Sequence, residues 1–312
     1  MTRFSTRRGN NERKSPPGGL ETSIKSTSAT SNNMNSTETN ANRLLAARAR
    51  NHVHRKRDIR EIVEPLDAIA ADSSYLIANH GATFQVDEET YTLPRYLYLG
   101  PGGGGEPIRI GLFATIHGDE PEGALALVEL IRRLEASPSL AQGYALFIYP
   151  LCNPTGFEDG TRCSRRGRDL NREFWNRSLE PEVQLLEQEL YLQNFHGIIA
   201  LHSDDTSAGL YGFVRGATLT THLMEPALKA ASAVLPVNRD GIIDGFNARG
   251  GIIREGYNGI LASPPKLKPK PFEMVFETPQ SAPLHQQVDA GSLALLSILA
   301  EYRRVISYGA NL

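Results

Sequence analysis

The feature that most constrains the fold is a strand, a polar turn and a helix in direct succession. Ile108 to Ala114 is an apolar run of strand length, and Glu122 to Glu135 carries apolar residues at helical spacing. Pro121 suits the first turn of that helix, where a backbone N–H is not needed. His117 and Glu120 therefore lie in a turn at the carboxyl end of a strand, where open α/β sheets place their binding sites.

The same alternation of strand and helix continues along the chain. It predicts an α/β fold with a mixed, largely parallel sheet and helices on both faces. Two long segments are too polar, or too rich in Gly and Pro, for core elements, and loops of such length are often functional. The expected strands are 82–86, 91–99, 144–149, 197–201 and 272–276, the helices 59–69, 180–194, 219–235 and 284–305, and the long loops 150–177 and 238–271.

Residues 1–57 differ in composition from the rest of the chain. They are rich in Ser, Thr, Asn and Arg and nearly free of long apolar side chains, so we expect a disordered basic tail before a domain at 58–312. An unstructured leader, a segment that binds an anionic partner and an organelle transit peptide all fit this composition. Met34 is an alternative start of the protein.

The overall composition argues against several classes of protein. The formal net charge of −2 gives no sign of nucleic-acid binding. We find no secretory signal and no apolar run near the ~18 residues of a membrane helix. Cys152 and Cys163 do not form a disulfide framework, and two free thiols are the ordinary state in the cytoplasm. We therefore expect a cytoplasmic protein without nucleic-acid or membrane partners.

Two further strands bring similar residues to the same edge of the sheet. The strand at 197–201 ends in His202, and the strand at 272–276 ends in Glu277. Two His and one Glu form a recognised catalytic zinc set with a fourth position for water, and another carboxylate can act as general base. Each residue alone has a plainer interpretation, as part of a surface turn or as an exposed strand end. Their coincidence at one edge predicts a zinc site instead.

The long loop at 150–177 offers cations that such a site would need. An amide hydrolase stabilises the developing oxyanion and anchors a substrate carboxylate, and Arg suits the second task through its bidentate geometry. The loop contains Arg162 and the run Asp169-Leu170-Asn171-Arg172. For the other arginines, a solvated basic loop is the preferred interpretation; they are Arg165, Arg166 and Arg168.

Together these motifs resemble the M14 superfamily of zinc carboxypeptidases, which includes the succinylglutamate desuccinylase and aspartoacylase branch. The resemblance covers about residues 95–305 and implies one Zn²⁺ per chain. Asp169 would orient the loop or a metal ligand. The motifs are His117-x-x-Glu120, Asn153-Pro154, Arg162, Asp169 to Arg172, His202 and Glu277. By the resemblance His117, Glu120 and His202 bind zinc, Glu277 is the general base, Arg162 polarises the scissile carbonyl, and Asn171 and Arg172 hold the substrate's terminal carboxylate.

The resemblance leaves the choice between two branches open. The compact stretch from Glu120 to His202 is similar to the deacylase branch and to small bacterial peptidases. Tyr257 stands near the place of the mobile tyrosine of carboxypeptidases, although a core tyrosine fits equally well, and Arg254 could face an acidic group of a substrate.

The predicted function is a zinc-dependent hydrolase that cleaves an amide bond next to a free carboxylate, in a small peptide or an N-acyl amino acid. The Phe-Glu-Thr-Pro context of Glu277, after a long loop, favours a metallocarboxypeptidase. The alternatives are an N-acyl-amino-acid deacylase and, from another class, a carboxylate-binding pseudoenzyme.

Overall fold

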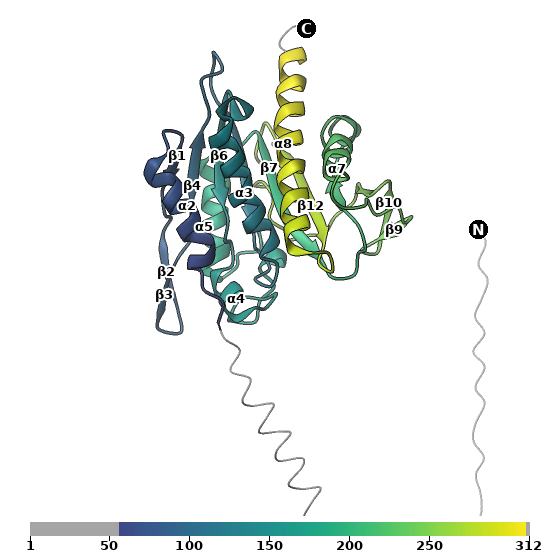
Figure 1. Cartoon of the computed structure of the whole chain (residues 1–312). Helices are drawn as coiled ribbons and strands as arrows, with labels where there is room; N and C mark the ends of the chain where they lie inside the picture. Colours follow the sequence, from purple (N-terminus) through teal and green to yellow (C-terminus); the bar gives the residue numbers. More distant parts are fainter. Residues whose placement is uncertain (1–55, 310–312) are drawn as a thin grey trace, which may run out of the picture. The chain divides into compact units, whose positions relative to one another are not determined.

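The computed structural model describes residues 56–309 (Figure 1). The predicted tail at 1–57, with its transit-peptide and Met34 alternatives, lies outside these residues except for its last two positions. Both of those contact the domain: Lys56 Nζ lies 3.1 Å from a carboxylate oxygen of Glu89, and the backbone N–H of Arg57 donates to Glu158 O at 2.8 Å.

A ten-stranded mixed sheet runs through the described part of the chain, in the order β1-β4-β6-β5-β7-β12-β8-β11-β10-β9. Its four central strands are parallel, as buried apolar runs favour. The chain runs from β5 to β6 on one side and then from β6 to β7 on the other side of β5. The strand order therefore reverses at β5, and its carboxyl end is a topological switch point. These strands are β6 (Tyr144–Tyr149), β5 (Ile108–Ala114), β7 (Gly197–Asp204) and β12 (Phe272–Pro279).

Shorter strands extend both sides of this centre. On one side, β4 and β1 add antiparallel strands to β6. On the other side, β8 pairs antiparallel with β12, and β11, β10 and β9 follow. Their bounds are β1 (Leu76–Ala78), β4 (Tyr96–Leu99), β8 (Tyr211–Val214), β9 (Ile242–Ile243), β10 (Phe246–Arg249) and β11 (Ile252–Ile253).

Helices cover both faces of the sheet, because side chains alternate between its faces along each strand. In β5, Leu112 belongs to the larger core with α2, α3, α7 and α8, whereas Phe113 belongs to a second core with α5. The predicted fold class is therefore confirmed. The helices are α2 (Arg60–Asp72), α3 (Glu122–Ala136), α5 (Pro181–Leu192), α7 (Glu225–Ala231) and α8 (Leu284–Gly309).

The expected strand at 91–99 is two separate strands. Its first part belongs to β3 (Glu89–Thr92), which forms a two-stranded hairpin with β2 (Thr83–Val86), and its second part is β4 of the main sheet. Pro94 lies between them, and proline cannot donate to a strand ladder, which accounts for the break.

Both expected long loops contain regular structure. The segment 150–177 holds α4 (Pro154–Asp159) and the 3₁₀ turn η2 (Leu170–Arg172), and each begins at a side-chain cap, Asn153 and Asp169 respectively. The segment 238–271 holds β9, β10 and β11, and the expected helix at 219–235 includes the π turn η3 (Thr220–Met224) before α7. These elements are too short for a periodicity to appear in the sequence.

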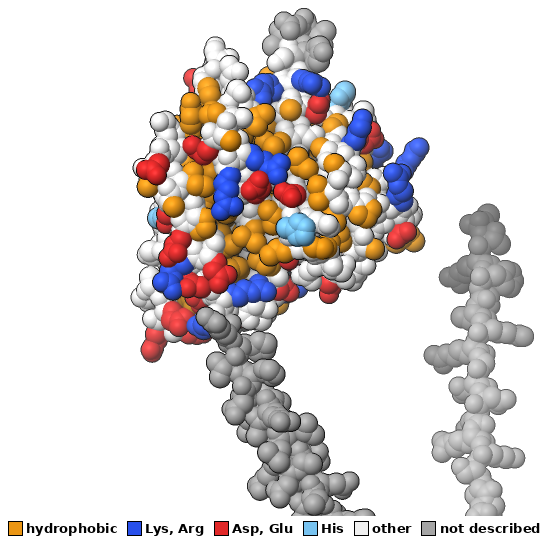
Figure 2. Space-filling view, in the orientation of Figure 1, with side chains coloured by type: hydrophobic (Ala, Val, Ile, Leu, Met, Phe, Trp, Pro, Cys, Tyr) orange, Lys and Arg blue, Asp and Glu red, His pale blue; other side chains and the backbone are white. Residues whose placement is uncertain are grey.

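Figure 2 shows hydrophobic side chains exposed among charged ones on the face of the molecule that carries α3 and α8. Within residues 56–309, no helix combines the length and the hydropathy that crossing a membrane requires.

Candidate metal centre and active site

The turn after β5 is held in one conformation by contacts on both sides. Thr115 Oγ1 donates to the carbonyl of Glu120 at 3.2 Å, and the backbone N–H of Asn153 donates to Thr115 O at 2.9 Å. A Cβ on Gly118 would lie 2.0 Å from the carbonyl carbon of Gly156, so only glycine fits where the turn meets α4. This packing fixes the direction of the two predicted ligands in the turn.

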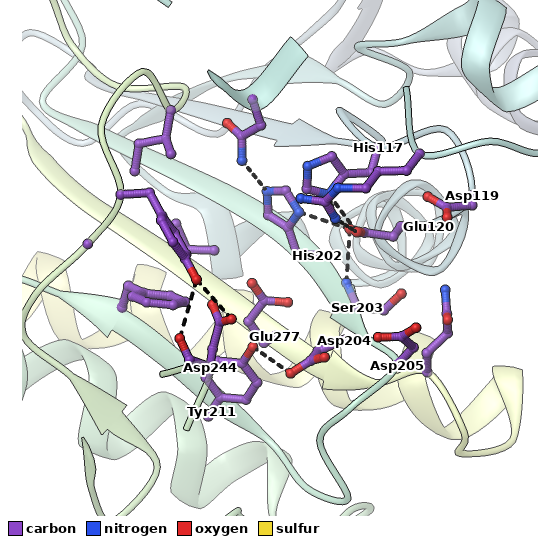
Figure 3. Close-up of a pocket in the computed structure, with 18 of the residues that line it drawn as sticks. His117, Asp119, Glu120, His202, Ser203, Asp204, Asp205, Tyr211, Asp244 and Glu277 are labelled. Carbon is purple, nitrogen blue, oxygen red and sulfur yellow. Dashed lines mark hydrogen bonds and ion pairs between the residues drawn. The ribbon is translucent and has the colours of Figure 1, made fainter. Parts of the chain in front are cut away.

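His117, Glu120 and His202 converge in a buried cluster (Figure 3). Their candidate ligand atoms all lie within 4.8 Å of one another. Glu120 Oε1 lies 2.6 Å from His117 Nδ1, and Glu120 Oε2 lies 2.8 Å from His202 Nδ1. The backbone N–H of Ser203 also donates to Glu120 Oε2, at 3.1 Å, which orients the carboxylate.

The chemistry of this cluster fits a divalent metal ion. A carboxylate between two imidazole nitrogens needs either protons or a cation to balance its charge. Burial opposes ionisation, but His202 and His117 lower the pKa of Glu120 to about 2, so the carboxylate is charged. Two imidazoles and one carboxylate are the donor set of a catalytic zinc site.

Asp169 supports this cluster from the loop. Its Oδ1 lies 3.3 Å from His117 Nε2, the ring nitrogen that faces away from Glu120. Burial lowers the pKa of His117, but Asp169 and Glu120 together raise it above the ordinary value. The geometry is that of an ion pair, since His117 Nε2 has no hydrogen-bond partner among the described residues. A metal-binding histidine usually has a carboxylate on the side of its second ring nitrogen, which favours one tautomer.

Glu277 lies beside His202 on the neighbouring strand. The two residues are paired in the parallel ladder of β12 and β7, so their side chains point to the same face. Both strands continue to Asp204 and Pro279, so these residues lie within the strands rather than just after them. Burial raises the pKa of Glu277 to about 8, although His202 opposes this. A carboxyl with such a pKa can accept and release a proton near neutral pH.

Arg162 is directed at the same cluster by Asp169. Its Nε donates to Asp169 Oδ2 at 3.1 Å, and its Nη1 lies 3.6 Å from Glu120 Oε1. Its side chain remains 45% exposed, so the guanidinium faces open space as well as the cluster.

Asn171 and Arg172 form the wall next to Arg162. Asn171 Oδ1 accepts a hydrogen bond from the backbone N–H of Leu261 at 2.8 Å, which ties η2 to the loop before β12. Arg172 Nη1 donates to Asn171 O at 2.8 Å, and its Cζ lies 4.2 Å from the centre of the Tyr257 ring. Tyr257 is 36% exposed and is therefore not a core residue.

All eight predicted site residues line one cavity of about 250 Å³. Arg254 does not line it. The cavity also has lining residues that the sequence analysis did not single out. Asp204 and Asp205 come two and three residues after His202 and could have been found from that position, whereas Tyr211 and Asp244 belong to the strands and turn that were missed. These further residues include Asp119, Ser203, Asp204, Asp205, Tyr211, Phe213 and Asp244.

The remaining arginines of the loop differ from one another. Arg166 and Arg168 are exposed, as expected. Arg165 was expected in solvent, but its side chain is only 14% exposed. It forms ion pairs at 2.9 Å with Asp159 and Glu158, because acidic residues of α4 face it across the loop.

Comparison with known proteins gives a family match over part of the chain and a fold. Residues 108–239 match the model of the succinylglutamate desuccinylase/aspartoacylase catalytic domain. No curated protein sequence matches the chain.

Solved structures with the same fold come from several bacteria. A candidate metallopeptidase from Shewanella amazonensis is 22% identical, with a TM-score of 0.66 over 78% of this chain and 92% of that one. A metallo-carboxypeptidase from Pseudomonas aeruginosa, in complex with (2-guanidinoethylmercapto)succinic acid, is 18% identical, with a TM-score of 0.54 over 77% and 68%. A succinylglutamate desuccinylase/aspartoacylase from Rhodobacter sphaeroides is 18% identical, with a TM-score of 0.51 over 73% and 65%. At these identities the likeness is one of fold.

Proposed function

We propose that this chain, whose family match and fold support the M14-like superfamily, is a zinc-dependent hydrolase that cleaves an amide bond next to a free carboxylate. The observation that carries the proposal is the convergence of three parts in one cavity. They are a buried His-Glu-His cluster, the carboxyl of Glu277 and the guanidinium of Arg172. Metal binding, proton transfer and carboxylate binding are the three tasks that this reaction requires.

The metal would be held by His117, His202 and the carboxylate of Glu120, through the Nδ1 atoms that face this carboxylate. A zinc ion bound there supplies Lewis-acid polarisation of the carbonyl and makes water more acidic. The donor types and the outer contact of His117 with Asp169 support zinc as the ion.

The chain's own residues would carry the proton and the charge. Glu277 would take a proton from the attacking water and return it to the leaving amine, because its carboxyl lies beside the metal cluster and burial raises its pKa above the ordinary range. Arg162 would donate hydrogen bonds to the oxyanion that develops on the carbonyl oxygen. Its contact with Asp169 keeps its guanidinium beside Glu120, close to the reacting bond.

Arg172 and Asn171 would bind the substrate's carboxylate. The planar fork of Arg172 can grip both oxygens of a carboxylate at once, and its flat face rests on Tyr257. The substrate would be a small peptide or an N-acyl amino acid, without nucleic-acid or membrane partners, and the protein would act in the cytoplasm.

A metallocarboxypeptidase remains our main assignment, because Tyr257 and Arg172 face each other in the cavity and Glu277 precedes Thr-Pro. An N-acyl-amino-acid deacylase is the second candidate, because residues 108–239 match the desuccinylase/aspartoacylase model. A pseudoenzyme is disfavoured, because a protein that only binds a ligand would not need a complete set of ligands and base.

The test is a substrate screen on zinc-loaded protein. Dipeptides and cell-wall peptides with a free C-terminus are compared with N-acyl amino acids, and the double variant His117→Ala with His202→Ala serves as the inactive control. Cleavage of either class by the wild type alone supports the proposal, and the preferred class decides between the two candidates. Lack of both metal and hydrolysis in the wild type would overturn it.

A further inference from the structure

Asp244, Tyr257 and Arg172 form a chain of contacts that joins three separate segments at the cavity. The hydroxyl of Tyr257 donates to Asp244 Oδ1 at 2.9 Å and lies 3.3 Å from Asp244 O. The Tyr257 ring in turn lies under the guanidinium of Arg172, with 4.2 Å from Cζ to the ring centre. Asp244 lies in the turn between β9 and β10, and Figure 3 shows it in the same pocket as Glu277.

The direction of the Arg172 fork depends on few contacts. One nitrogen, Nη1, is fixed by the carbonyl of Asn171 at 2.8 Å, and the flat face rests on Tyr257. Bidentate binding of a carboxylate requires the plane of the guanidinium to be correctly oriented. The position of the Tyr257 ring therefore sets the orientation of the group that would bind the substrate.

The Tyr257 side chain is itself held by neighbouring residues. Its edge packs against Phe246, with ring centres 4.9 Å apart and nearly perpendicular, and its hydroxyl is bound by Asp244. The Phe213 ring lies further away, with ring centres 6.5 Å apart. Since Tyr257 is 36% exposed and comes from a segment without strand or helix, the hydroxyl contact adds a restraint on the outward side of the ring.

The backbone of Asp244 is specialised for presenting this side chain. Asp244 has φ +51° and Gly245 has φ +76°, so both central residues of the tight turn are left-handed. Asp-Gly is a preferred pair for such a hairpin turn. The short hairpin thus carries the Asp244 carboxylate to the cavity wall, where Tyr257 meets it.

We propose that Asp244 is a positioning residue for substrate binding: it holds Tyr257, which in turn orients Arg172. This inference rests on the proposed function, because it concerns carboxylate binding in the same pocket. Asp244 would contact neither the metal nor the scissile bond. Its loss should therefore weaken carboxylate binding and leave metal binding unchanged.

Two variants distinguish the effect of the hydrogen bond from that of the backbone conformation. Asp244→Gly removes the side-chain acceptor and leaves only the backbone carbonyl, whereas Asp244→Asn keeps a side-chain acceptor oxygen; both Gly and Asn adopt positive φ readily. The first measurement is the ¹⁵N order parameter of Arg172 Nε in the full zinc-loaded chain. We expect wild type and Asp244→Asn to be equally rigid and Asp244→Gly to be more mobile. An unchanged Arg172 in Asp244→Gly would overturn the proposal, and this readout does not depend on any activity.

The second measurement is the Kd for succinate, with succinamide as the uncharged control. Loss of one hydrogen bond should raise the Kd for succinate about three- to tenfold in Asp244→Gly, with rescue in Asp244→Asn and no change for succinamide. Tyr257→Phe should have a similar effect, and the double variant Asp244→Gly with Tyr257→Phe should add little to it. Equal losses of succinate affinity in the Asn and Gly variants, or additive losses in the double variant, would refute the proposal that Asp244 orients Arg172 through Tyr257.

The two measurements also distinguish failure of this inference from failure of the proposed function. If wild type bound succinate no better than succinamide, carboxylate recognition in the proposed function would fail, while the order parameter would still decide whether Asp244 fixes Arg172.

Discussion

Glu277 and His202 lie directly opposite one another in the parallel ladder of β12 and β7. Side chains of paired residues in parallel strands point to the same face. The carboxyl that we propose for proton transfer and the imidazole that we propose as a metal ligand are therefore held next to each other by the sheet itself. Changes to either side chain should affect its own task without moving the other.

The histidine pair should control metal content. We expect one zinc ion per chain, and either His117→Ala or His202→Ala should remove the metal and the activity together, because each takes away a buried ligand. Elemental analysis of the purified variants measures this directly. His285→Ala, at an exposed histidine of α8, should keep both. Retention of zinc by the variant with both ligand changes would show that the ion lies elsewhere.

Loss of the proposed base, Glu277, should reduce activity without loss of the metal. Glu277→Gln keeps the shape of the side chain but cannot take a proton, so activity should fall by about 10²–10⁴-fold while zinc stays bound. Parallel measurement of kcat and zinc content checks the prediction. If zinc were lost with the activity, Glu277 would be a ligand, and its role and that of Glu120 would have to be exchanged.

The turn after β5, which carries His117 and Glu120 (the ligand turn), approaches α4 closely, and this should require glycine at position 118. In Gly118→Ala the new Cβ would meet backbone atoms of Gly156 and Phe157, which cannot move as a flexible side chain would. We expect a loss of about 1–3 kcal/mol in the free energy of unfolding, with weaker zinc binding because His117 and Glu120 share the turn. Gly102→Ala is the control, because its Cβ would meet nothing within 4 Å. Equal Tm values for the two variants would show that the turn adapts.

The segment before the domain should be dispensable for catalysis. A chain that starts at Lys56 should keep its zinc content and kcat, because residues 1–55 are poor in the apolar side chains that build a core. Arg57 should matter more, since its Nη1 donates to Gly118 O in the ligand turn at 3.1 Å. Arg57→Ala in the shortened chain should therefore lower Tm. An inactive or unfolded shortened chain would disprove the first expectation.

The central strands and the ligand cluster could be predicted because their signals are local and strong. The strands β5, β6, β7 and β12 are apolar runs, and His117, Glu120, His202 and Glu277 occupy the carboxyl-terminal ends of three of them or the turn that follows. The parallel order of these strands then brings the four side chains together. The sequence alone therefore leaves few alternative arrangements for these four side chains at this edge of the sheet.

The opposite wall of the cavity could not be predicted in the same way. The strands β8 to β11 have two to four residues each, too few for a periodic pattern, and they are stabilised by pairing with distant strands. Tyr211 and Asp244 are carried by these strands and by their turn. Arg165 shows a related limit, because residue type does not reveal that acidic partners of α4 surround it.

Arg172 should decide which substrates the enzyme accepts. Arg172→Lys should be impaired, because an ammonium group cannot copy the two parallel hydrogen bonds of the fork, and Arg172→Ala more so. Charge-assisted bonds contribute about 1.5–3 kcal/mol each, so losing the pair should lower kcat/KM by well over tenfold with zinc retained. Arg168→Ala, at an exposed arginine of the same loop, is the matched control and should have little effect.

A comparison of free and amidated substrates then identifies the group that Arg172 binds. Amidation of the substrate's carboxylate should lower kcat/KM strongly for the wild type and little for Arg172→Ala. Both changes remove the same interaction, so their effects should not add. The test is to measure kcat/KM for each enzyme, wild type and Arg172→Ala, with each substrate, free and amidated. If the wild type cleaved amidated and free substrates equally well, Arg172 would not bind a carboxylate. Neither a carboxypeptidase nor an amino-acid deacylase would then fit, because both depend on that group, and only the metal-dependent part of the chemistry would stand.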